Sequence, residues 1–311
     1  MMFRNSFRLL FSNFSLFWKE LLYRIIVLGI CLLLLLPLLK NFLSLGSTQI
    51  FFENAKNLFL HFPFNSLKDY FAYVWQTLQS LFSCISELFD SNAFGVVYLF
   101  FVLFFLCPFL ISMGDIAVGE VLYCSMSSLS KVSYTGMYVR KIGKSLLYSL
   151  FKTMLSLPFV ALTLCSLYGF LYLSMINDVW LIFAPMLMIV SFILIMGLDI
   201  CLTSGFMPAL VVYNCKAKNA FAKGIKAVGR RFFRCLSTIT MMLLLLLSIG
   251  LLFGVLSTFV LMPLGYMLIL IFRMVMFFGS QGMNYYVDLD TILKPKKLEE
   301  TDRMKKAIDL I

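Results

Sequence analysis

The chain has 311 residues, of which 61% are hydrophobic and only 13% are charged, and its formal net charge is +11. A soluble domain is about half apolar and about a quarter charged, so too few charges are present to cover a water-facing surface. The composition therefore predicts an all-α, polytopic membrane bundle. A nucleic-acid partner is not expected, because Lys and Arg are concentrated in alternate connecting segments, as membrane topology requires.

Six apolar stretches are long enough to cross a bilayer, for which a helix needs about 20 residues. In chain order, the predicted crossings are 25–45, 93–113, 146–173, 179–201, 236–260 and 264–283. The lead 1–24 has its apolar residues at helical spacing, which predicts an amphipathic helix on the cytoplasmic side. No small-x-small cleavage site follows the first apolar run, so we interpret it as a retained membrane helix.

The segment 46–92 between the first two crossings is predicted to lie outside the cell. Its second half has apolar residues at helical spacing with polar residues mainly between them. A helix of this kind lies flat on a membrane surface or caps a bundle. Trp75 is typical of the interfacial depth at which such a helix would lie.

The stretch 179–213 is too long for one simple crossing and too short for two crossings with a loop. In one interpretation, the crossing ends near 201 and its continuation, interrupted by Gly205 and Pro208, runs along the cytoplasmic interface. In the other, the whole stretch is one long kinked helix, because membrane helices tolerate Gly and Pro.

Basic residues set the expected orientation. With six crossings, the lead, the segments 125–145 and 214–235, and the tail 284–311 all fall on one side, which the positive-inside rule assigns to the cytoplasm. Both termini are therefore predicted to be cytoplasmic. The opposite side has only Lys40, Lys56 and Lys68, of which Lys40 lies at the end of the first crossing.

The segment 214–235 is itself predicted to form an amphipathic helix, with an apolar stripe that includes Phe221, Ile225, Val228 and Phe232. Its basic stripe consists of Lys216, Lys223, Lys226, Arg230 and Arg234. Basic amphipathic helices bind anionic leaflets, so this stripe is a candidate surface for anionic lipid head groups or for a protein partner.

Charges within membrane helices are costly and are candidates for function. Arg273 lies about nine residues into the last crossing, roughly 14 Å deep at 1.5 Å per residue. The acidic candidates are Asp199, Asp115 and Glu120, which the predicted crossings place near the inner interface, beyond the direct reach of Arg273. Two hypotheses remain open: a functional polar site between helices, or a structural clamp of Arg273 to a carboxylate or a carbonyl.

No residue pattern indicates catalysis, a metal site or a cofactor. His61 is the single histidine, and no GxSxG, P-loop or HExxH motif occurs. The eight cysteines lie mostly in apolar runs or beside basic segments, which is typical of small buried residues rather than of a disulfide framework. We therefore expect a protein that is not an enzyme.

The residues around the fourth crossing show a likeness to known proteins. Pro208-Ala209-Leu210-Val211-Val212 is followed by Ala217, Asn219-Ala220 and basic residues up to Arg234. This run resembles uncharacterised bacterial multi-pass proteins and, in layout, the membrane domain that precedes some glycerophosphodiester phosphodiesterases. The catalytic domain of those enzymes is absent here. The resemblance implies a helical bundle of the bacterial plasma membrane, not a phosphodiesterase.

Two functional hypotheses follow. In the first, the chain is a non-enzymatic scaffold or accessory component of a transport or envelope system. In the second, it is a transporter or permease subunit with a polar site near Arg273, and the segment 216–234 docks a separate cytoplasmic ATPase.

Overall fold

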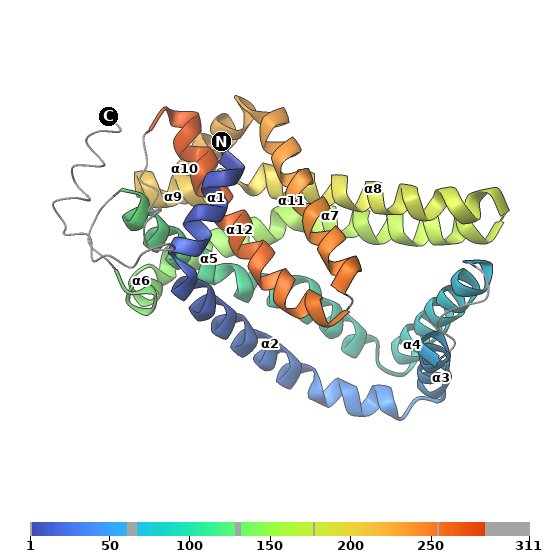
Figure 1. Ribbon diagram of the computed structural model, residues 1–311. Helices are drawn as coiled ribbons and strands as arrows, with labels where there is room; N and C mark the ends of the chain where they lie inside the picture. The colour runs from blue at the N-terminus through green and yellow to red at the C-terminus, as the bar shows by residue number, and fades with distance from the viewer. Residues whose placement is uncertain (1, 61–66, 128–131, 177, 254, 284–311) are drawn as a thin grey trace. The chain divides into compact units, whose positions relative to one another are not determined.

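The computed structural model describes residues 2–60, 67–127, 132–176, 178–253 and 255–283 (Figure 1). Throughout these segments every regular element is helical, and six helical spans are long and apolar enough to cross a membrane. The predicted all-α, polytopic membrane architecture is thus confirmed. The tail 284–311 and His61 lie outside the described residues.

The helices are, in chain order, α1 (Met2–Ser12), α2 (Phe14–Leu43), α3 (Gly46–Leu60), α4 (Leu67–Phe100), the π-helical η1 (Phe101–Leu106), α5 (Cys107–Met126), α6 (Tyr134–Arg140), α7 (Ile142–Ile176), α8 (Asp178–Thr203), α9 (Phe206–Tyr213), α10 (Ala217–Gly229), α11 (Phe232–Phe253) and α12 (Val255–Gln281).

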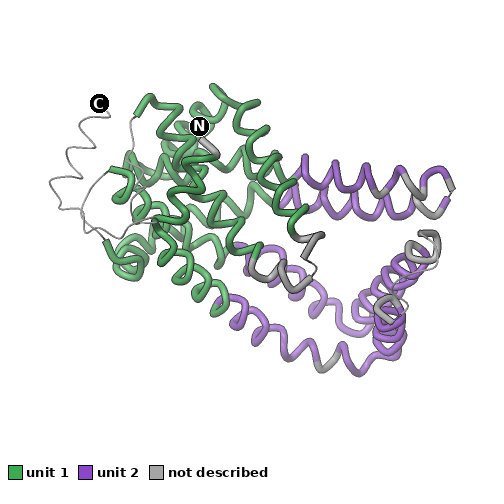
Figure 2. Tube along the Cα trace, in the orientation of Figure 1, with its two compact units in different colours: residues 1–26, 109–156, 196–311 green, residues 27–108, 157–195 purple. Residues whose placement is uncertain are grey.

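The chain forms two compact units, and the boundary between them falls within α2, α5, α7 and α8 (Figure 2). Unit 1 comprises residues 1–26, 109–156 and 196–311, and unit 2 comprises 27–108 and 157–195. The division separates the charges. Of the Lys and Arg residues in the described segments, unit 2 contains only Lys40, Lys56 and Lys68.

In unit 2, α3 packs against α4. The segment predicted to be external contains α3 and the part of α4 up to Asn92. The helix α4 bends at Asn92, whose backbone leaves the helical conformation (φ −156°, ψ 77°). The Asn92 side chain accepts a hydrogen bond from the backbone N–H of Gly95 at 2.9 Å and so caps the helix that follows. The ring of Trp75 contacts the rings of Tyr168 and Tyr172 on α7, which belong to the same unit.

In unit 1, the helix α12 is the centre of the core. It is buried from Met267 to Phe278, and α1, α9, α10 and α11 all pack against it (Figure 1). The N-terminal helix α1 therefore packs against the bundle with its apolar side: Leu9 and Leu10 are buried in the same core. A helix buried nearly all round accounts for the uniformly apolar sequence of α12 on either side of Arg273.

The continuation of the fourth crossing is buried within the protein. The chain turns at Ser204–Gly205, and α9 continues into the core of unit 1, with residues 206–211 buried. The helix ends at Asn214, which adopts the left-handed conformation (φ 48°) that Asn tolerates, and the Nζ atoms of Lys141 and Lys144 donate to its side chain.

Two glycines fix the crossing of α9 and α10. A Cβ atom added to Gly205 would lie 2.4 Å from the carbonyl oxygen of Gly224, and one added to Gly224 would lie 2.7 Å from the carbonyl carbon of Gly205. Because both obstacles are backbone atoms, no side-chain rotation relieves the clash. The basic helix is therefore attached to the core by a backbone-to-backbone contact.

This contact can be tested with two alanine substitutions in α10. We expect Gly224→Ala to destabilise unit 1 by about 1–3 kcal/mol, as overpacking does in cores, and to expose α10 to trypsin. Gly229→Ala is the matched control, because nothing lies within 4 Å of its added Cβ. Melting in detergent and limited trypsin digestion provide the readouts. Equal behaviour of the two variants would contradict the proposed crossing.

Candidate intramembrane polar site

The carboxylate of Asp115 on α5 is fully buried and collects three partners within unit 1. The Nζ of Lys152, on α7, donates to its Oδ2 at 2.8 Å. The hydroxyl of Tyr148, one turn earlier on α7, donates to the same oxygen at 3.0 Å, and the hydroxyl of Tyr266, on α12, donates to Oδ1 at 2.7 Å. One ion pair and two phenol donors thus satisfy a charge that would otherwise be very costly inside a membrane domain.

A second ion pair adjoins the first through Tyr266. The guanidinium carbon of Arg24, on α2, lies 3.6 Å from the centre of the Tyr266 ring, which is a cation–π contact. The Nε of Arg24 donates to Glu20 one turn earlier at 3.0 Å. Glu20 is buried as well and accepts a hydrogen bond from the hydroxyl of Tyr134, on α6, at 3.0 Å. Burial is the largest cause that raises the pKa of Tyr134, and the neighbouring Glu20 carboxylate raises it further. The phenol therefore stays protonated and remains a donor.

Arg273 is buried on α12 and has hydroxyl partners. Its Nη2 donates to Thr203 on α8 at 2.9 Å, and its Nη1 donates to Tyr148 at 3.4 Å. No carboxylate of the described residues lies within 4.0 Å of the guanidinium, and its Nε has no hydrogen-bond partner. One hypothesis for Arg273 included a direct pairing with a carboxylate. The described residues do not form that pairing.

The four predicted site residues are partly brought together. Asp115 and Arg273 share Tyr148 as a common partner. The Asp199 side chain accepts from Ser156 at 2.8 Å, and its backbone carbonyl accepts from the hydroxyl of Thr203, through which it is joined to Arg273. Glu120 belongs elsewhere, because it pairs with Lys141 at 3.0 Å.

Several members of this network were not predicted from the sequence. Lys152, which lies within the predicted crossing 146–173, is the cation of the central ion pair. Tyr148, Tyr266, Glu20 and Arg24 were not singled out. The available signal was the spacing of polar residues along α7, which recur on one helical face in an otherwise apolar crossing.

The predicted basic surface is exposed on α10 and the residues that flank it. The exposed cations are Lys216, Lys223, Lys226, Arg230 and Arg234. On the other side of α10, Ala220, Gly224, Ala227 and Val228 are buried. The predicted apolar stripe was therefore partly wrong: Val228 is buried and Phe221 packs against the core, but Ile225 is 46% exposed among the lysines.

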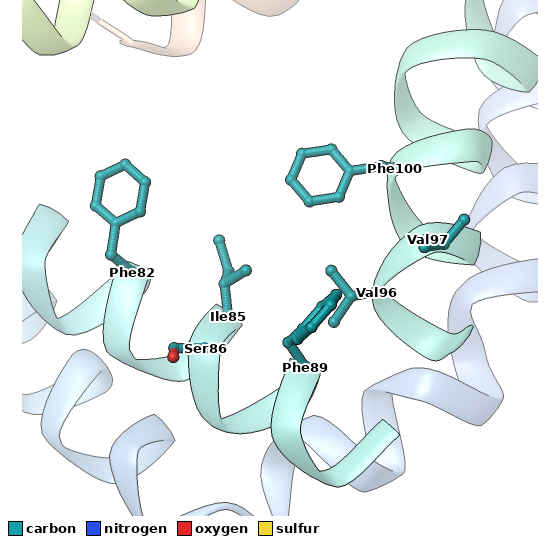
Figure 3. A pocket seen from close by; sticks show the side chains of 7 residues that line it. All are labelled: Phe82, Ile85, Ser86, Phe89, Val96, Val97 and Phe100. Atoms are coloured by element: carbon teal, nitrogen blue, oxygen red, sulfur yellow. The ribbon is translucent and has the colours of Figure 1, made fainter. Parts of the chain in front are cut away.

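Unit 2 has an open apolar groove on the inner side of the Asn92 bend (Figure 3). Phe82 and Ile85 from before the bend, and Phe100 from after it, face the same space. Ser86 is the single polar residue of the lining, so this groove offers a surface for apolar chains rather than a site for chemistry.

Within the described segments, no group of three or more His, Cys, Asp or Glu side chains is arranged to hold a metal ion. The eight cysteines are free thiols, and the Sγ of Cys235 lies 3.7 Å from the hydroxyl oxygen of Ser204.

Comparison of the chain with protein-family models, with characterised proteins and with solved structures finds no match.

The central ion pair can be tested by removing one charge. We expect Asp115→Asn to destabilise the protein by about 3–5 kcal/mol, because it leaves the Lys152 ammonium buried without a carboxylate. Glu120→Gln on the same helix is the matched control; its partner Lys141 is partly exposed, so a loss of about 1 kcal/mol or less is expected. Thermal melting in detergent measures both.

A double variant distinguishes the loss of the ion pair from other effects of the substitution at position 115. Asp115→Asn combined with Lys152→Met removes both charges and should recover part of the stability that Asp115→Asn loses. Additive losses would show that Lys152 does not depend on Asp115.

Proposed function

We propose that the chain is a non-enzymatic membrane component, a scaffold or accessory subunit, of a transport or envelope system in the bacterial plasma membrane. The observation that supports this most directly is the attachment of α10. A basic helix is held on a buried core by the Gly205–Gly224 contact, and its cations point outward. Such a helix is a rigid platform for an anionic partner.

No acidic residue of the described segments pairs with this platform. The sequence has no acidic residue between Asp199 and Asp288. The acidic residues of unit 1 within its described segments are Glu20, Asp115, Glu120 and Asp199; the first three are paired with cations, and Asp199 is hydrogen-bonded. The Nζ of Lys223 lies 4.0 Å from the centre of the Tyr213 ring. Each exposed cation contributes about 1 kcal/mol near an anionic membrane surface.

The same segregation of charge supports a cytoplasmic location for both termini. Unit 1 contains the N-terminal lead and the segments 125–145 and 214–235, and unit 2 contains the segment proposed to be external. By the positive-inside rule, the basic unit belongs on the cytoplasmic side. Phe233, which is 83% exposed beside Arg234, suits burial at the head-group level of that leaflet.

The proposal that the protein is not an enzyme is supported by the engagement of its buried groups. Asp115 and Glu20 each face a cation and a phenol, which is how structural carboxylates are satisfied, and neither stands beside a nucleophile with a base.

Affinity purification from gently solubilised membranes tests the platform. We expect the wild-type chain to recover a defined partner protein that is mostly lost when Lys216, Lys223, Lys226, Arg230 and Arg234 are all replaced by Gln. The control replaces Lys40, Lys56 and Lys68 of unit 2 by Gln and should retain the partner. Repeated recovery of the wild-type chain alone would count against a partnered scaffold.

A second candidate function, a transporter or permease subunit coupled to a separate ATPase, is favoured by Arg273. A buried guanidinium with hydroxyl partners and an unpartnered Nε is unusual for a purely structural clamp. In this reading α10 acts as the coupling helix.

Complementation of a deletion strain tests this second candidate. We expect Arg273→Lys to lose function while the protein is still present in membranes, because Lys cannot reproduce the forked donor geometry. Ser248→Ala on the exposed side of α11 is the control and should complement fully. Full function of both Arg273→Lys and Arg273→Leu would remove the main support for a transport role.

A further inference from the structure

The helix α7 is amphipathic. Its polar face is turned toward the protein interior, and its apolar face is exposed. Six polar residues lie on this face, and five of them are buried. They are Ser145, Tyr148, Ser149, Lys152, Thr153 and, half-buried, Ser156. Their spacing places them along one side of the helix over roughly 16 Å. The opposite side, with Leu147, Phe151 and Met154, is exposed and suits lipid.

Half of this face is already engaged. Tyr148 and Lys152 bind Asp115, and Ser156 donates to Asp199 at the far end of the face from Ser145. The other half, Ser145, Ser149 and Thr153, forms a line at intervals of four residues.

The hydroxyls of this line are buried without hydrogen-bond partners. This is uncommon, because Ser and Thr within helices usually donate to a carbonyl three or four residues earlier. Thr163 and Ser166, farther along the same helix, do so. The Nε of Arg273 is a further buried donor without a partner. Each unsatisfied buried donor is costly, so such a set calls for an acceptor-bearing ligand.

The groups around the line favour a ligand that accepts hydrogen bonds. Lys152 pairs directly with Asp115, whereas Arg273 has hydroxyl partners and interacts with Asp115 and Asp199 only at longer range. Asp199 lies beyond Thr153 in the direction of Ser156, so the part of the face between Ser145 and Thr153 has donors without acceptors.

We propose that this part of α7, together with Arg273, is a binding site for a small oxyanion group, a phosphate or a carboxylate. The group is either a free solute or a lipid head group, since both present the same oxygens. This proposal is independent of the proposed scaffold function. Binding is measured on the purified chain, so its result does not depend on whether a partner is recovered.

Thermal melting of the purified full chain in detergent tests the free solute. Inorganic phosphate and acetate are titrated against sodium chloride at equal ionic strength. We expect at least one oxyanion to raise the melting temperature in a saturable manner that chloride does not reproduce. Native mass spectrometry with short-chain phosphatidylglycerol tests the lipid arm, with phosphatidylcholine as the neutral control.

Single substitutions then locate the site. Ser149→Ala and Thr153→Val keep the shape of the helix and should each weaken binding about fivefold to tenfold, as expected for one lost hydrogen bond. Ser248→Ala should bind as the wild type does. Absence of binding in both arms, or unchanged affinity in the Ser149→Ala/Thr153→Val double variant, would overturn the proposal. Because both variants remove an unpartnered hydroxyl, they are expected to fold.

Discussion

A carboxylate with no access to water must find its charge partners within the protein, and Asp115 shows how much structure that requirement determines. Its oxygens are reached from two helices, by an ammonium and a phenol of α7 and a phenol of α12. The phenol on α12 then carries Arg24 of α2 on its face, and Arg24 is held in turn by Glu20. Since breaking a buried ion pair is far costlier than never having formed it, each partner fixes the next, and four crossings are held in register.

Outside this network, close packing determines which polar groups are exposed. The Gly205–Gly224 contact brings α10 against the core, so that small residues are hidden and the long cations are left outside. Among the described residues of unit 1, the ion pairs of Asp115 and Glu20 lie in the interior, and the cations of α10 lie on the exterior without carboxylate partners. The two arrangements are complementary: the interior charges stabilise the fold, and the exterior ones are available for recognition.

The membrane class and the helical architecture followed from composition alone, because few charges and long apolar runs leave no other solution. Arg273 and Asp115 were recognised because a charge within an apolar run is conspicuous. Lys152 was not recognised, because its importance depends on Asp115 of a neighbouring helix. Which helices meet is set by long-range packing, so the partnership of Asp115 with Tyr266, 151 residues away, could not be predicted from local spacing. The burial of α9 against the core of unit 1 is likewise set by long-range packing, because its apolar sequence suits a core as well as an interface.

The inward polar face of α7 has a consequence for how the protein is made. Lys152 and Tyr266 are 114 residues apart, so at about 5–20 residues per second Lys152 is synthesised roughly 6–23 seconds before its partner on α12. During that interval the ammonium of Lys152 can rely on Asp115, which has already been translated, but not on the phenol. The first ion pair can therefore form before α12 is made, and α12 completes a polar interior that the earlier helices have begun.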